Sequence, residues 1–212
     1  MSDYKRLFIA GIGTGVGKTI ASAILCELFE ADYWKPVQAG DIDNGDKSKI
    51  KQLISNKKSF IHPEAYCLPY PVSPHASAEK AGTTVNENNL IIPETSDKLI
   101  IEGAGGLLVP LNYETLYIDW IKKINIRVVL ISRHYLGSIN HTLLSCESLR
   151  ARNIHVEGIL FNGIENKQTE KVIEQHSGYP VLGRIDPVNR VTKKFVRDQA
   201  LKLKRNEYFR KG

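Results

Sequence analysis

The stretch LFIAGIGTGVGKT at residues 7–19 decides how this 212-residue chain folds. Four apolar residues are followed by glycines at positions 11, 13, 15 and 17, and then by Lys18 and Thr19. A strand, a glycine loop and a helix in this order are the context of a phosphate-binding loop, because glycines let backbone N–H groups surround an anion and the helix adds its positive N-terminal end. We therefore interpret the segment as a nucleoside triphosphate site, in which Lys18 reaches the terminal phosphates and Thr19 holds Mg²⁺.

The loop departs in one respect from the usual G-x-x-x-x-G-K-[ST] pattern. Counting back from Gly17, the first glycine is expected at position 12, where the chain has Ile12, and Gly11 lies one residue earlier. A strand-to-helix turn that is merely rich in glycine is the alternative interpretation. Gly-Lys-Thr at the start of an amphipathic helix, directly after an apolar strand, favours the nucleotide site.

The composition excludes several classes of protein. An apolar fraction of 42% is enough to build a core and excludes wholesale disorder. No apolar run approaches the ~20 residues that span a bilayer, and the polar start of the chain does not resemble a signal peptide. The three cysteines lie far apart, at positions 26, 67 and 146, which is typical of reduced thiols in a cytosolic protein. We expect a cytoplasmic location and no membrane partner.

The net charge of +6 is concentrated near the C-terminus. The basic stretch begins at Lys193 and extends to Lys211, with few interleaved aromatic residues. We therefore expect a solvated helix face here and no nucleic-acid partner. A basic protein also suits phosphate-rich or carboxylate substrates.

Apolar runs and helical patterns alternate along the rest of the chain. Strands are expected at residues 7–10, 32–34, 98–102, 127–132, 156–161 and 181–185. Helices are expected from residue 18, from about residue 46, at 118–124, 138–152 and 167–176, and in the basic last twenty residues. This alternation predicts an α/β fold of the P-loop NTPase type, with a mostly parallel sheet and helices on both faces. No linker is evident, so residues 1–212 are expected to form a single ATP-binding domain, with a basic helix and tail from about residue 190.

The residues that could carry chemistry follow the predicted strands. In an open parallel sheet, ligands bind beyond the carboxyl ends of the strands. Glu102 ends one strand, and Asp46 begins a helix, so both could join Thr19 as oxygen ligands of Mg²⁺. A strand-end carboxylate facing water and a helix N-cap are the respective alternatives. Lys35 ends another strand and could steady developing negative charge, although a surface lysine is the commoner case.

The segment after the strand expected at residues 156–161 gives some information on which nucleotide base is bound. A switch-type GTPase has Asn-Lys-x-Asp there, whereas this chain has Asn162-Gly163-Ile164-Glu165. The absence of that lysine and aspartate favours ATP. The amide of Asn162 could hydrogen-bond an adenine edge, and a turn-forming Asn-Gly pair is the equally good alternative.

Several segments together resemble the dethiobiotin synthetase family. The matching segments occur in the order of the family and are residues 11–19, 35–37, 73–75, 102–106, 136–141, 162 and 182–185. The resemblance implies an ATP-dependent cyclo-ligase of biotin biosynthesis that forms C–N bonds. Its substrates would be 7,8-diaminononanoate, CO₂ and ATP, with Mg²⁺ as cofactor, and it would work as a homodimer with the site at the subunit interface. A carbamate, and then a carbamic–phosphoric anhydride, would precede ring closure, with release of ADP and phosphate.

The resemblance also assigns residues to roles. Lys18 and Lys35 would be catalytic, and Thr19, Asp46 and Glu102 would coordinate the metal. Substrate would contact Thr14 and Lys35 and, from the other subunit, Gly137, Ser138, Ile139 and Asn140 at a helix start. ATP would contact Gly13, Thr14, Gly15, Val16, Gly17, Lys18, Thr19, Asp46, Glu102, Gly103, Ala104, Gly105, Asn162, Gly163, Asp186, Pro187 and Val188. Ala39 replaces a serine that often touches substrate in the family, so that hydrogen bond is missing here.

Two other functions fit parts of the pattern. An amide-forming synthetase that activates a carboxylate with ATP often carries a glutaminase domain, for which 212 residues leave no room. A partitioning-type ATPase acts as a nucleotide switch and usually has a second lysine early in the glycine loop, where this chain has Ile12 and Gly13.

Overall fold

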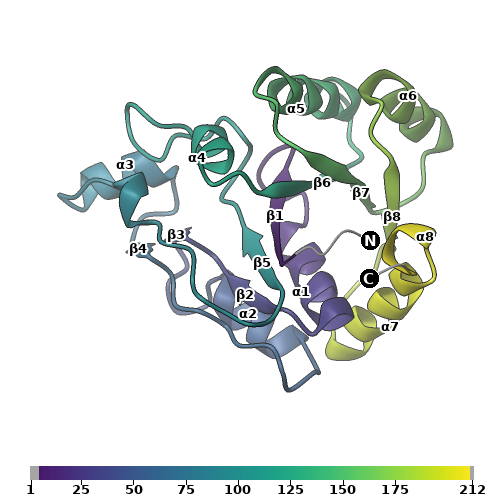
Figure 1. Cartoon of the computed structure of the whole chain (residues 1–212), viewed down its shortest axis with the longest axis horizontal. Helices are drawn as coiled ribbons and strands as arrows, with labels where there is room; N and C mark the ends of the chain where they lie inside the picture. The colour runs from purple at the N-terminus through teal and green to yellow at the C-terminus, as the bar shows by residue number, and fades with distance from the viewer. Residues whose placement is uncertain (1–4, 211–212) are drawn as a thin grey trace.

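The computed structural model describes residues 5–210, and Lys211 of the basic tail lies outside the described residues. Its central sheet has six strands, all parallel, in the order β2-β5-β1-β6-β7-β8 (Figure 1). The prediction of a mostly parallel sheet is confirmed. The strands are β1 (Arg6–Gly11), β2 (Asp32–Trp34), β5 (Leu99–Glu102), β6 (Arg127–Arg133), β7 (Val156–Asn162) and β8 (Val181–Ile185).

The strands are nearly continuous apolar runs because both faces of the sheet are covered. Every residue of β5 is buried, and so are all residues of β1 except its first. Helices α1 (Lys18–Phe29), α2 (Asp46–Leu53) and α7 (Lys193–Lys204) lie on one side, below the sheet in Figure 1. Helices α4 (Tyr117–Lys123), α5 (Ser138–Ala151) and α6 (Lys167–Ser177) lie on the other side. The short α8 (Glu207–Arg210) follows α7.

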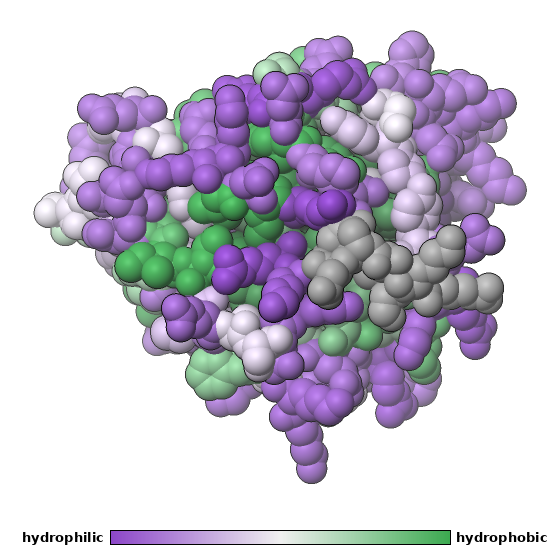
Figure 2. All heavy atoms as spheres, viewed as in Figure 1, coloured by the Kyte–Doolittle hydropathy of each residue, from purple (hydrophilic) through white to green (hydrophobic). Residues whose placement is uncertain are grey.

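The basic helix α7 is amphipathic. Val196, Ala200 and Leu203 are buried on the face that packs against α1, while Lys193 and Lys194 are exposed. Figure 2 shows that the viewed face of the molecule is mostly hydrophilic, with hydrophobic side chains visible in its hollows. Within residues 5–210, no helix is long and apolar enough to cross a membrane. The three cysteines are free thiols.

A second, two-stranded parallel sheet was not predicted. It pairs β3 (Val37–Ala39) with β4 (Tyr66–Leu68), just beyond the edge strand β2. The sequence around β4 is rich in proline, and no local pattern in it indicates the strand with which it pairs. Helix α3 (Pro74–Lys80) and the short 3₁₀ helix η1 (Glu87–Asn89) complete this part of the chain.

The order of strands creates a switch point between β1 and β5. The loop after β1 leads into α1 on one face, while the loop after β5 leads toward α4 on the opposite face (Figure 1). Loops that diverge in this way open a crevice at the carboxyl ends of the two neighbouring strands. The phosphate-binding loop and Glu102 both lie at this crevice.

Candidate active site

The loop between β1 and α1 has the backbone that a phosphate-binding loop requires. Gly17, immediately before the helix, has a φ of 100°, which L side chains rarely adopt. A Cβ atom on Gly17 would lie 2.1 Å from Nδ2 of Asn162, so a side chain there would displace the Asn162 amide. The side chain of Val16 is buried, which anchors the loop to the core.

Lys18 is folded back along this loop. Its Nζ donates hydrogen bonds to the carbonyl oxygens of Gly13, at 2.9 Å, and of Gly105, at 2.6 Å. Burial lowers the pKa of Lys18 to about 8, although the nearby Glu102 opposes the shift. The amine therefore lies among backbone dipoles with its charge only partly compensated, a setting in which a phosphate would be a favourable partner.

Four polar side chains from distant parts of the sequence meet beside Lys18. The hydroxyl of Thr19 donates to Oε1 of Glu102 at 2.8 Å. Nζ of Lys35 forms an ion pair with Asp46 and lies 3.7 Å from Oε1 of Glu102. The sequence argument placed these residues at strand and helix ends, and the fold brings them together.

The charges in this cluster support one another. Burial alone would lower the pKa of Lys35, but Glu102 and Asp46 outweigh burial and raise it. Burial likewise disfavours the Asp46 carboxylate, yet Lys35 holds the pKa of Asp46 below its ordinary value. Lys35 is thus an ammonium, and Asp46 a carboxylate, across the neutral pH range.

Glu102 is the most enclosed charged side chain of the cluster, at 1% exposed. Its second oxygen, Oε2, accepts a hydrogen bond from the hydroxyl of Tyr33 at 2.9 Å. Burial and the neighbouring carboxylate raise the pKa of Tyr33 well above its ordinary value, so the hydroxyl keeps its proton. The sequence analysis missed Tyr33, because nothing in a buried aromatic residue of an apolar strand signals a contact with a residue 69 positions away.

A cavity of about 660 Å³ opens beside these residues. Its polar end is formed by Thr14, Lys18, Thr19, Lys35, Asp46 and Glu102. Its apolar wall includes Ala39, Pro71, Val72, Pro74 and Val109. From the sequence, only Ala39 and the matching segment that contains Pro74 were singled out. The volume and the mixed lining are those of a site for a small ligand with a charged end and a hydrocarbon part.

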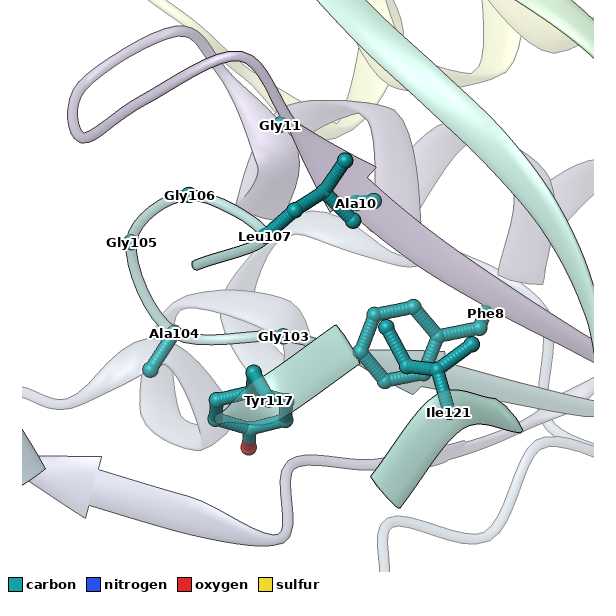
Figure 3. Close-up of a pocket in the computed structure, with 10 residues that line it drawn as sticks. All are labelled: Phe8, Ala10, Gly11, Gly103, Ala104, Gly105, Gly106, Leu107, Tyr117 and Ile121. Carbon is teal, nitrogen blue, oxygen red and sulfur yellow. The ribbon is translucent and has the colours of Figure 1, made fainter. Parts of the chain in front are cut away.

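Ala104 and Gly105 line the 660 Å³ cavity, and Figure 3 shows the loop of Gly103 to Leu107 that contains them. Phe8, Tyr117 and Ile121 lie behind the loop, around a small internal space of about 10 Å³. A Cβ atom on Gly103 would lie 2.8 Å from Cζ of Phe8, so glycine lets the loop rest directly on the ring. This packing fixes the Gly105 carbonyl that accepts from Lys18.

The residues expected at the adenine lie at the ends of β7 and β8. The side chain of Asn162 donates to the carbonyl oxygen of Val16 at 2.9 Å, which ties β7 to the phosphate-binding loop. The N–H of Gly163 donates to Ile185, and the Asp186 carboxylate is paired with Lys202 at 2.6 Å. Burial would raise the pKa of Asp186, but the hydrogen bonds from Lys202 and Gln199 lower it. Of this group, Asn162 contacts the phosphate-binding loop, and neither it nor Gly163, Asp186, Pro187 or Val188 lines the 660 Å³ cavity within the described chain.

The residues expected at the substrate carboxylate lie at the start of α5, where Gly137, Ile139 and Asn140 are exposed and Ser138 is buried. Gly137 precedes α5 with a φ of 100°, and Ser138, Ile139 and Asn140 form the first turn of that helix. Leu136, just before them, is fully exposed. None of these residues lines the described cavity.

The donor set fits Mg²⁺ that arrives with a nucleotide. Residues 5–210 contain no group of three or more His, Cys, Asp and Glu side chains placed to hold a metal ion. Mg²⁺ is usually bound by one or two carboxylates together with waters and substrate phosphates. Thr19, Asp46 and Glu102 offer one hydroxyl and two carboxylates on one side of the cavity, which matches that requirement.

The fold and this site define a P-loop nucleotide-binding protein. Residues 5–194 match the family model described as AAA domain. Among solved structures, a ParA family ATPase from Chlorobium tepidum is 15% identical with a TM-score of 0.60, covering 94% of this chain and 99% of that chain. A cell division ATPase MinD from Pyrococcus furiosus is 11% identical with a TM-score of 0.59, covering 97% and 94%. At these identities the likeness concerns the fold alone.

Curated relatives narrow the class further. The ATP-dependent dethiobiotin synthetase BioD of Christiangramia forsetii is 49% identical over 95% of this chain and 97% of the relative. The protein of the same name from Cytophaga hutchinsonii is 47% identical over 96% of this chain and 99% of the relative. The chain belongs to the family of ATP-dependent dethiobiotin synthetases. The resemblance read from the sequence motifs is thereby confirmed.

Proposed function

We propose that this protein is an ATP-dependent dethiobiotin synthetase that converts 7,8-diaminononanoate, CO₂ and ATP into dethiobiotin, ADP and phosphate. The observation that carries the proposal is the meeting of Lys18, Thr19, Lys35, Asp46 and Glu102 at one end of a cavity whose other wall is apolar. Family membership supports the same reaction. The ParA and MinD neighbours share the fold, and a partitioning-type ATPase that acts as a nucleotide switch is the alternative function.

The triphosphate would be held by the phosphate-binding loop. Backbone N–H groups from Gly13 to Thr19 and the start of α1 would surround the phosphates, and Lys18 would leave its carbonyl partners to meet the terminal ones. Thr19, Asp46 and Glu102 would hold Mg²⁺, which neutralises charge on the phosphate oxygens when bound. Asn162, Gly163 and residues 186–188 would contact the adenine, because they follow the neighbouring strands β7 and β8 and Asn162 contacts the phosphate-binding loop.

The chemistry would proceed by activating one oxygen of a carbamate. One amine of the substrate adds to CO₂ and loses a proton, and a carbamate oxygen then displaces ADP from the γ-phosphorus. The second amine attacks the carbonyl carbon of the resulting carbamic–phosphoric anhydride, the C–O bond to phosphate breaks, and the amine proton is lost. Phosphate replaces a poor leaving group, and holding both amines against one carbonyl supplies proximity.

Lys35 would stabilise the negative charge that develops in these steps. Asp46 and Glu102 keep its Nζ protonated and aimed into the cavity. With Asp46 and Glu102 holding Mg²⁺, the Lys35 ammonium would be available to the carbamate and to its phosphorylated form. A preorganised cation in an enclosed site is an effective source of such stabilisation.

The rest of the substrate would lie along the apolar wall. Ala39, Pro71, Val72 and Val109 present hydrocarbon surface to its alkyl chain. The helix start at Gly137 to Asn140 of a second subunit would present N–H groups to the carboxylate at the far end. We therefore expect one domain over residues 1–212, a cytoplasmic homodimer and no nucleic-acid or membrane partner.

One assay tests the proposal. Protein, MgATP, bicarbonate and 7,8-diaminononanoate are mixed, and ADP and the cyclic urea are quantified together. Equal amounts of the two products, both dependent on the diamine, are expected. ADP release that ignores the diamine would refute the proposal and favour a nucleotide switch.

A further inference from the structure

Two buried polar side chains flank Lys35: Tyr33 contacts the Glu102 carboxylate, and Gln38 contacts the backbone N–H of Asp46. Tyr33 lies two residues before Lys35 on β2, and Gln38 lies three residues after it on β3. We propose that Tyr33 and Gln38 are positioning residues that hold Glu102 and Asp46 in the arrangement which binds the magnesium–nucleotide complex. The inference rests on the proposed ATP site and explains how its two carboxylates, Asp46 and Glu102, are held in position.

Tyr33 determines how the Glu102 carboxylate is turned. Oε2 accepts from the Tyr33 hydroxyl at 2.9 Å, while Oε1 accepts from Thr19 at 2.8 Å and faces Lys35 at 3.7 Å. Tyr33 itself is fully buried, so its hydroxyl has no freedom to follow the carboxylate elsewhere. With Oε2 held from behind, Oε1 is the oxygen presented to the cavity.

Gln38 plays the same part for Asp46 by a different route. Its Oε1 accepts from the backbone N–H of Asp46 at 3.4 Å, and its Nε2 donates to the carbonyl oxygen of Gly40 at 2.8 Å. Helix α2 has no side-chain cap of its own at Gly45. Gln38 therefore supplies a partner to an N–H at the start of the helix, where such groups lack partners within the helix.

The packing around Gln38 makes this contact specific. Gln38 is only 6% exposed, and a Cβ atom on Gly45 would lie 3.2 Å from its Cδ. The helix start thus lies directly against the amide, and Asp46 is placed by it. Three polar side chains of residues 33–38 thus contact the site. Tyr33 contacts Glu102, Gln38 contacts Asp46, and Lys35 lies next to both.

Such supporting contacts affect metal binding in a measurable way. Loss of a partner that orients a metal ligand typically costs about 10- to 100-fold in metal affinity or activity. Removal of the Tyr33 hydroxyl should therefore weaken the contribution of Mg²⁺ to nucleotide binding, while phosphate contacts to Lys18 and the loop remain. A purely structural role for Tyr33 would lower stability without changing that contribution.

The test is calorimetric titration of ADP into Tyr33→Phe, Gln38→Leu and the unaltered protein, with Mg²⁺ and with EDTA. The quantity compared is the ADP affinity with Mg²⁺ divided by the ADP affinity in EDTA. Tyr117→Phe is the matched control, because Tyr117 is a buried tyrosine whose hydroxyl has no hydrogen-bond partner among the described residues. Steady-state formation of the cyclic urea at varied Mg²⁺ is measured alongside.

We expect the ratio to fall about tenfold in Tyr33→Phe and in Gln38→Leu, with the affinity in EDTA unchanged, and to stay unchanged in Tyr117→Phe. An unchanged ADP affinity in EDTA also shows that each variant is folded. If only one of the two variants folds, that variant is enough for the test. Unaltered ratios in both variants would overturn the inference and leave the proposed function standing. An unaltered protein that neither couples ADP to Mg²⁺ nor makes the cyclic urea would instead refute the proposed function.

Discussion

Nucleotide affinity should depend on pH through Lys18. Burial lowers the pKa of Lys18 to about 8 in the unliganded protein. A bound triphosphate adds negative charge beside the amine and raises that pKa, so nucleotide binding takes up a proton above pH 8. Affinity should therefore be flat up to about pH 8 and then fall by about tenfold for each further pH unit.

The size of this effect can be worked out for a practical range. Between pH 7 and pH 9.5 the affinity should fall by about 30-fold, provided that the pKa of Lys18 in the complex lies above that range. Phosphate groups contribute little, because their second pKa is about 6. Lys35 contributes little as well, because its pKa is raised.

The assay is a titration of ADP in EDTA at several pH values, with Lys18→Arg as the control. Arginine stays protonated throughout the range, so its profile should be nearly flat. A flat profile in the unaltered protein would refute the reasoning. The same slope in Lys18→Arg would also refute it, since another group would then be responsible.

Three further predictions follow from the same structure. Lys35→Ala should lower kcat at least ~100-fold in the cyclic urea assay, because the charge stabilisation by its ammonium is lost. The far-UV circular dichroism spectrum should stay unchanged. A variant that retains activity would remove Lys35 from the mechanism. Gly103→Ala should lower the free energy of unfolding by about 1–3 kcal/mol in a urea titration, because its Cβ atom would lie 2.8 Å from the buried Phe8 ring; a variant of unchanged stability would mean that the loop can move aside. The pKa of Lys18 falls from 10.5 to about 8 on folding, so the charged amine opposes folding below pH 8, and this cost disappears as the pH rises to 10.5. Relative to Lys18→Met, the free energy of unfolding of the unaltered protein should therefore rise by about 3 kcal/mol between pH 8 and pH 10.5. A difference between the two proteins that stays constant with pH would contradict the lowered pKa.

Much of the fold could be predicted because its signals are local. An apolar strand followed by glycines, Lys18 and Thr19 identifies the phosphate-binding loop within thirteen residues. The rule that ligands bind at the carboxyl ends of parallel strands then places Glu102 and Lys35 beside it. The contacts among Thr19, Lys35, Asp46 and Glu102 in the structure agree with that placement.

The rest depends on contacts that no local pattern encodes. The pairing of β3 with β4 joins two short segments that look like loops. The contact of Tyr33 with Glu102 depends on the register of β2 against β5, which sets the direction in which each side chain points. Asn162 could be placed at a strand end, but its hydrogen bond to Val16 follows only from the folded position of the loop.

The central claim is that one site joins ATP cleavage to ring closure through an oxygen of CO₂. It is tested most directly by mixing ¹⁸O-labelled CO₂ rapidly with protein, MgATP and 7,8-diaminononanoate in unlabelled water, and analysing the released phosphate by mass spectrometry. The account predicts one labelled oxygen in the phosphate for each dethiobiotin formed, because the carbamate oxygen leaves with the γ-phosphoryl group. Phosphate that carries no oxygen from CO₂ would contradict it.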